Sequence, residues 1–168
     1  MHAPANISHN SYIQRELIVA SVVNVLLGVL ATYAFVPHNV PVPLWGDQGI
    51  AVDLVPTVFM LTLIGNTVIT FVTRHRLQTG KVTPMLAARC GWLARHLPRR
   101  AVPRILLLAF TATALVVPVS ILGFWLLGVE AMRFDHYLLF KACYGPLVGA
   151  LSARSAVEAA LTREGARA

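Results

Sequence analysis

Residues 105–128 read ILLLAFTATALVVPVSILGFWLLG, a stretch that contains no charged side chain. A helix rises about 1.5 Å per residue, so about 20 residues cross a hydrocarbon core about 30 Å thick. Three further stretches have similar length and apolar character: Leu17–Val36, Ile50–Thr73 and Tyr137–Val157. The sequence therefore predicts an all-α, polytopic membrane protein whose four transmembrane helices form a bundle.

The composition agrees with a membrane location. Of the 168 residues, 57% are hydrophobic and only 12% are charged, whereas soluble domains carry about 25% charged residues. This length leaves room for a single membrane domain, residues 1–168, without a separate soluble module. The polar residues 1–16 precede an apolar run that no cleavage site follows, so we expect the first span to be retained. We expect the protein to lie in a cell membrane, and we interpret this membrane as a bacterial inner membrane.

The distribution of positive charge predicts the orientation. Eight of the fourteen Lys and Arg residues lie between Arg74 and Arg104 without any acidic residue, and residues 37–49 contain neither Lys nor Arg. Cytoplasmic loops collect Lys and Arg. The basic loop 74–104 and both termini are therefore expected in the cytoplasm, an N-in/C-in topology. The expected partner of this loop is anionic lipid in the bilayer, and we expect no nucleic acid.

Within the basic loop, apolar residues recur with helical spacing. Leu86, Cys90, Leu93 and Leu97 fall at i, i+4, i+7 and i+11. This pattern predicts a short amphipathic helix on the inner leaflet. A solvated basic loop with chance periodicity is the alternative. At the outer boundary, an aromatic belt is expected at the headgroups, made of Tyr33, Trp45, Trp125, Phe134 and Tyr137.

Four polar side chains lie inside the predicted spans. Asn24 and Asn66 are each about 10 Å deep in the same leaflet. Spans 1 and 2 are joined by a short loop, so an interhelical hydrogen bond between these amides is expected. Asp53 and Lys141 are each about 5 Å inside the outer boundary. Their opposite signs predict an interhelical ion pair, with independent snorkelling to the headgroups as the alternative. These four polar residues either stabilise the bundle or take part in transport.

Prolines and glycines give two further predictions. Pro56, Pro118 and Pro146 are expected to kink the second, third and fourth spans, because proline removes a helical hydrogen bond. Gly145 and Gly149 form a G-x-x-x-G motif, which lets another helix approach closely. The approaching helix belongs either to the same bundle or to a second copy in a homodimer.

The sequence shows no chemical signature of catalysis. Motifs for nucleotide, serine-hydrolase or zinc-protease chemistry are absent, and there is no Cys-x-x-Cys. Cys90 and Cys143 are expected on opposite sides of the bilayer, so they do not form a disulfide. The histidines lie in loops rather than at matching depths in the spans. We therefore expect no enzyme activity, no metal and no cofactor.

Two functional hypotheses follow. The preferred one is an accessory or scaffold subunit that packs against itself or a larger membrane complex, as the G-x-x-x-G motif and the small loops indicate. The alternative is an oligomeric small-solute permease or channel. Its polar path would pass near Asp53, Lys141, Asn24 and Asn66.

Overall fold

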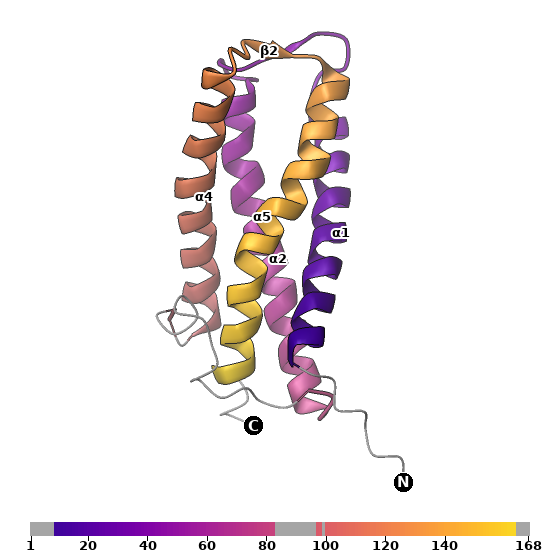
Figure 1. Ribbon diagram of the computed structural model, residues 1–168, viewed down its shortest axis with the longest axis vertical. Coiled ribbons are helices and arrows are strands. Elements are labelled where there is room, and N and C mark those ends of the chain that lie inside the picture. Colours follow the sequence, from indigo (N-terminus) through magenta and orange to yellow (C-terminus); the bar gives the residue numbers. More distant parts are fainter. Residues whose placement is uncertain (1–8, 83–96, 99, 164–168) are drawn as a thin grey trace.

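The computed structural model describes residues 9–82, 97–98 and 100–163, and this part of the chain is mainly helical (Figure 1). The long helices lie side by side, and the first of them begins at the end of the molecule where the last one stops (Figure 1). Two short strands connect the loops at the opposite end. The elements are α1 (His9–Phe35), β1 (Val42–Pro43), α2 (Ile50–Gln78), α4 (Ala101–Leu126), β2 (Ala131–Met132) and α5 (Phe134–Arg163).

Among the described residues, three helical segments are long and apolar enough to cross a membrane: Ser11–Phe35, Ile50–Gln78 and Ala101–Leu126. They contain the first three apolar stretches of the sequence except for Val36, Leu127 and Gly128. The fourth stretch also forms a helix, α5, which extends beyond Tyr137–Val157 at both ends. This helix is less apolar because it carries Lys141, Arg154 and Glu158.

The helices extend beyond the apolar stretches that predicted them. α1 begins at His9 instead of Leu17, and α2 continues past Thr73 to Gln78. The first residues of the basic loop 74–104 are therefore helical. Backbone hydrogen bonds continue through polar residues, so a change in hydropathy does not mark the end of a helix. The predicted amphipathic helix over Leu86–Leu97 lies almost wholly outside the described residues.

The short loop between spans 1 and 2 suggested that these two helices are the closest neighbours, but the helices pack differently. α5 packs along both α1 and α2, and α4 packs along α2, whereas α1 contacts α2 much less than it contacts α5. The G-x-x-x-G motif explains this arrangement. A Cβ atom added at Gly145 would lie 2.9 Å from the backbone oxygen of Asn24. Glycine thus lets α1 approach α5 closely, and the motif serves a contact within the chain.

The end with the two strands, here called the ladder end, is closed by both loops together. β1 and β2 pair antiparallel, with Val42 opposite Met132 and Pro43 opposite Ala131. The Leu44 amide adds a hydrogen bond to the Glu130 carbonyl at 2.7 Å. Val42 and Leu44 are buried in the hydrophobic cluster at this end. The opposite end, where α1 begins and α5 stops, is called the terminal end.

The three helical prolines interrupt none of the helices. Pro56 lies inside α2, Pro118 inside α4 and Pro146 inside α5, and each helix continues on both sides of its proline. The predicted kinks at these positions remain predictions.

Candidate functional site

A charged cluster lies near the ladder end, where α2 meets α5. α2 contributes Asp53 and Thr57, and α5 contributes Tyr137 and Lys141. Residues four positions apart share one face of a helix. The Lys141 ammonium forms an ion pair with the Asp53 carboxylate and donates a hydrogen bond to Thr57 Oγ1 at 2.6 Å. The Tyr137 hydroxyl donates to the same carboxylate. These four residues are called the ladder-end layer.

Burial distinguishes the members of this layer. Lys141 is only 3% exposed, whereas the Asp53 side chain is 35% exposed. The structure therefore contains the ion pair expected from the sequence, and Lys141 does not snorkel to the surface. Tyr137 is fully buried, so its assignment to the aromatic belt is wrong. Its hydroxyl is satisfied by Asp53 inside the protein, whereas Tyr33 and Trp125 remain exposed.

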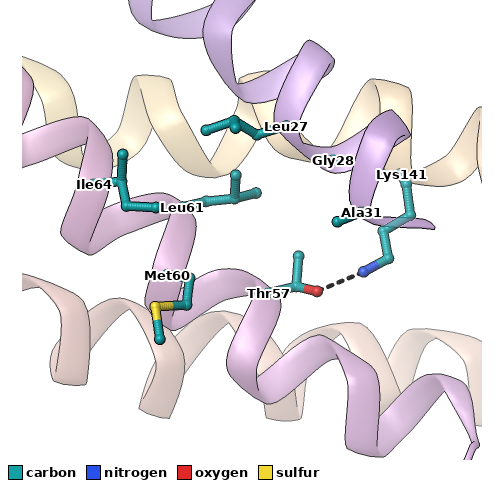
Figure 2. A pocket seen from close by; sticks show the side chains of 8 residues that line it. All are labelled: Leu27, Gly28, Ala31, Thr57, Met60, Leu61, Ile64 and Lys141. Atoms are coloured by element: carbon teal, nitrogen blue, oxygen red, sulfur yellow. Dashed lines mark hydrogen bonds between the residues drawn. The ribbon is translucent and has the colours of Figure 1, made fainter. Parts of the chain in front are cut away.

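A cavity of about 170 Å³ adjoins the ladder-end layer (Figure 2). Helices α1, α2 and α5 all contribute to its wall. Lys141 and Thr57 mark one end of the cavity, and apolar side chains including Leu27 and Ile64 lie toward the other. The complete lining is Leu27, Gly28, Ala31, Thr57, Met60, Leu61, Ile64 and Lys141. The cavity is therefore apolar except at a single end.

The middle of the molecule contains three buried polar side chains, Asn24, Thr62 and Asn66, called the middle layer. Each is 1% exposed. Asn24 Nδ2 donates to the Gly145 carbonyl at 3.4 Å. Among the described residues, Asn24 Oδ1, Thr62 Oγ1 and both amide atoms of Asn66 have no hydrogen-bond partner. Leaving such buried groups unpaired costs about 1–3 kcal/mol each, so the layer is not optimised for stability alone.

The predicted hydrogen bond between Asn24 and Asn66 is wrong. Asn24 is directed to α5, where it bonds Gly145. On α2, Gly65 is the residue that approaches it, since a Cβ at Gly65 would lie 3.9 Å from Asn24 Oδ1. Neighbouring residues on a helix point about 100° apart, so Asn66 cannot share the direction of Gly65. Asn24 and Asn66 lie at a similar height along the helices, since Gly65 is beside Asn24. Equal height does not determine which way each side chain points.

A third group of polar contacts, the terminal layer, lies near the terminal end. Arg104 is fully buried and donates to Thr70 Oγ1 at 3.2 Å. The Tyr12 hydroxyl and Thr73 Oγ1 share a hydrogen bond of 3.1 Å. Arg76 also contributes, since it forms an ion pair with Glu16 and lies 5.3 Å from the centre of the Tyr12 ring.

Sequence reasoning did not identify Thr57, Thr62 or the members of the terminal layer other than Thr70. Arg104 was assigned to the basic loop and Glu16 to the polar N-terminal segment, because charges at the edge of an apolar stretch usually lie at the interface. Thr57 had a usable signal, since it follows Asp53 by four residues on α2. Tyr137 precedes Lys141 by four residues on α5 and carried the same signal.

Together the three layers form what we call the polar column. α2 contributes to every layer over a length of about 30 Å, at a rise of about 1.5 Å per residue. The residues that α2 contributes to the column are Asp53, Thr57, Thr62, Asn66, Thr70 and Thr73. A helix turns about 100° per residue, so Asp53 and Thr57 point to a different side of α2 from the other four residues. Those four are buried, whereas the Asp53 side chain is 35% exposed.

The described part of the chain is all-helical apart from one short strand pair, and three of its helices are long and apolar enough to cross a membrane. This indicates a membrane location. No family model, curated protein or solved structure matches the chain. Within the described part of the chain, no three His, Cys, Asp or Glu side chains lie close enough to hold a metal ion. The site must therefore be interpreted from its own chemistry.

Proposed function

We propose that the protein is an integral membrane protein with four spans, oriented N-in/C-in in a bacterial inner membrane. Positive charges at the terminal end support this orientation: the described residues Arg74, Arg76, Lys81 and Arg100 lie there. Apart from the paired Asp53 and Lys141, the ladder end carries one positive residue, Arg133, and three acidic ones, Asp47, Glu130 and Asp135. Trp45 and Trp125 are exposed near that end, as expected for headgroup anchors on the outer side.

Cysteine labelling tests this orientation. In a background without Cys90 and Cys143, single cysteines replace Gln48 in the first loop and Thr83 in the basic segment. A membrane-impermeant maleimide added to intact cells is expected to label position 48 and not position 83. Permeabilised cells provide the control, since both positions must then react. Labelling of position 83 in intact cells would reverse the proposed topology.

The function that the geometry supports best is that of a small-solute permease or channel, and its expected oligomeric state remains a prediction. The polar column is the observation that supports it. Ionisable side chains within membrane spans are costly and are characteristic of solute and ion pathways. In the middle layer, Asn66 is buried with both amide atoms unpartnered among the described residues. A purely structural role does not explain why α2 carries such a group.

An accessory or scaffold subunit is the second candidate. Large apolar side chains are exposed along α4 and fit a partner helix as well as lipid; they are Leu107, Phe110, Leu115, Val119 and Leu122. The G-x-x-x-G motif no longer favours a homodimer, since α1 of the same chain occupies it. Mass measurement after purification in mild detergent separates the candidates, because a defined hetero-complex favours the accessory subunit.

The variant Asn66→Leu tests the permease proposal. Removing an unpartnered buried amide is expected to raise the free energy of unfolding by about 1 kcal/mol. If Asn66 lines the path, the same change lowers solute flux at least tenfold. Flux is measured in liposomes with a panel of small anions, cations and polyols. Thr67→Leu is the matched control, because Thr67 is the next residue on α2 and its hydroxyl is exposed.

Either of two results would contradict the proposal. The first is that wild-type protein conducts no member of the panel above the rate of empty liposomes. The second is that Asn66→Leu conducts as well as wild-type protein. A more stable but inactive Asn66→Leu would assign Asn66 to function, since removing a functional polar group commonly stabilises a fold.

A further inference from the structure

The cavity beside Lys141 has the polarity of a binding site for an amphiphilic molecule. Its polar atoms, Lys141 Nζ and Thr57 Oγ1, lie at one end, and apolar side chains line the rest (Figure 2). Its volume of about 170 Å³ is similar to that of an engineered apolar cavity of about 150 Å³ that binds benzene, but this cavity is open to the surface, where Met60 and Ile64 are 51% and 41% exposed. A ring or a short alkyl chain therefore fits the apolar part.

The hydrogen-bond donors of Lys141 and Thr57 determine which kind of head group fits the polar end of the cavity. A lysine ammonium has three donors. In Lys141 one is directed to Asp53 and one to Thr57, which leaves a third. Thr57 Oγ1 accepts from Lys141, and among the described residues no acceptor is found for its own hydrogen. One ammonium donor of Lys141 and the hydroxyl donor of Thr57 thus have no acceptor among the described residues.

The charges at the cavity favour an anionic head over a cationic one. Lys141 lines the cavity, whereas Asp53 does not. The Asp53 carboxylate pairs with Lys141 and accepts from Tyr137 outside the lining, so the ammonium is the charge nearer to a bound head group. An ionised carboxylate only accepts hydrogen bonds, and charge-assisted bonds of this type are stronger than neutral ones.

From this geometry we propose that the cavity binds a small monocarboxylate. Its carboxylate accepts hydrogen bonds from Lys141 and Thr57, and its apolar body lies between α1 and α2. The inference deepens the proposed function and rests on it, because the bound acid would be a solute of the polar column. The cavity extends from the ladder-end layer toward Leu27 and Ile64, and in the proposed topology the acid would enter from the outer half of the membrane.

Binding of benzoate to the detergent-purified full chain tests this assignment. Isothermal titration calorimetry compares benzoate with benzyl alcohol and benzylamine, which have the same ring and a different head. Empty micelles correct for partition. Benzoate is expected to bind at least tenfold more tightly than either analogue. Equal affinity for all three would overturn the assignment, because it would show that the head is not recognised.

Three variants locate the binding. Thr57→Val keeps the ion pair and is expected to weaken benzoate binding about tenfold, as for the loss of one charge-assisted bond. Ala31→Phe fills the cavity from α1 and is expected to abolish binding. Thr67→Val is the matched control, since Thr67 lies on α2 outside the cavity lining. Wild-type affinity in Thr57→Val or in Ala31→Phe would overturn the assignment.

Further results distinguish a small acid from a membrane fatty acid, and the binding-site proposal from the permease proposal. Binding of hexadecanoate without binding of benzoate would overturn the assignment to a small acid and indicate a membrane fatty acid. The permease proposal and the carboxylate-site proposal can be contradicted separately. Benzoate binding without any solute flux removes the permease and keeps the site, whereas flux without benzoate binding removes the site and keeps the permease.

Discussion

Asp53→Asn is expected to lower the free energy of unfolding by about 3 kcal/mol, because it leaves the buried Lys141 ammonium without its counter-charge. Lys141 is 3% exposed and packed beside Tyr137 and Thr57. Lys141→Met is expected to destabilise the protein less, because Asp53 is partly exposed and still accepts from Tyr137. Unfolding in detergent followed by circular dichroism measures both effects.

The double variant distinguishes a coupled pair from two independent residues. Asp53→Asn/Lys141→Met removes both charges, so it is expected to be more stable than Asp53→Asn alone. A double variant as impaired as the sum of the single variants would show that the residues do not interact. Asp135→Asn is the matched control: its ion pair with Arg133 spans 3.7 Å with both side chains about three-quarters exposed, so its loss is expected to leave stability unchanged.

Gly145→Ala is expected to destabilise the protein by about 2 kcal/mol, the cost of overpacking a tight contact. The new Cβ would lie 2.9 Å from the Asn24 backbone oxygen, and a backbone atom cannot rotate away as a side chain can. At Gly149 the nearest atom is Asn24 Nδ2, at 2.1 Å from the added Cβ. Gly149→Ala is therefore expected to be partly rescued by Asn24→Ala.

Gly123→Ala is the control for this prediction. Gly123 lies inside α4, and a Cβ added there meets no atom within 4 Å. Alanine has the higher helix propensity, so this variant is expected to be as stable as wild-type protein or more stable. If Gly145→Ala were equally harmless, the close contact between α1 and α5 would not exist as described.

Depth along a helix was predictable from the sequence, and the Asp53–Lys141 pair shows why. Both residues could be counted from a boundary of their apolar stretch, and helical rise converts that count to a position along the membrane normal. The i, i+4 spacing would also have identified Thr57 and Tyr137 as neighbours of this pair. Charge counts likewise predicted an orientation, which remains to be tested by labelling.

Helix rotation and helix adjacency were not predictable in the same way. The Asn24–Asn66 bond was expected because a short loop joins their helices, yet α1 packs mainly on α5. The choice of neighbour depends on close approach at Gly145 and Gly149, which the sequence allowed either within the chain or between chains. Arg104 was missed for a related reason, since a charge at a helix end is buried only if its neighbours cover it.

The central claim is that the polar column is accessible to water-soluble molecules in the membrane, and cysteine accessibility measures this directly. In a cysteine-free background, Asn66→Cys and Leu115→Cys are exposed in liposomes to a small charged thiosulfonate reagent. The polar column predicts that position 66 reacts, although Asn66 is buried, and that the exposed, apolar position 115 on α4 does not. Absence of reaction at position 66 would contradict a solute path through these helices.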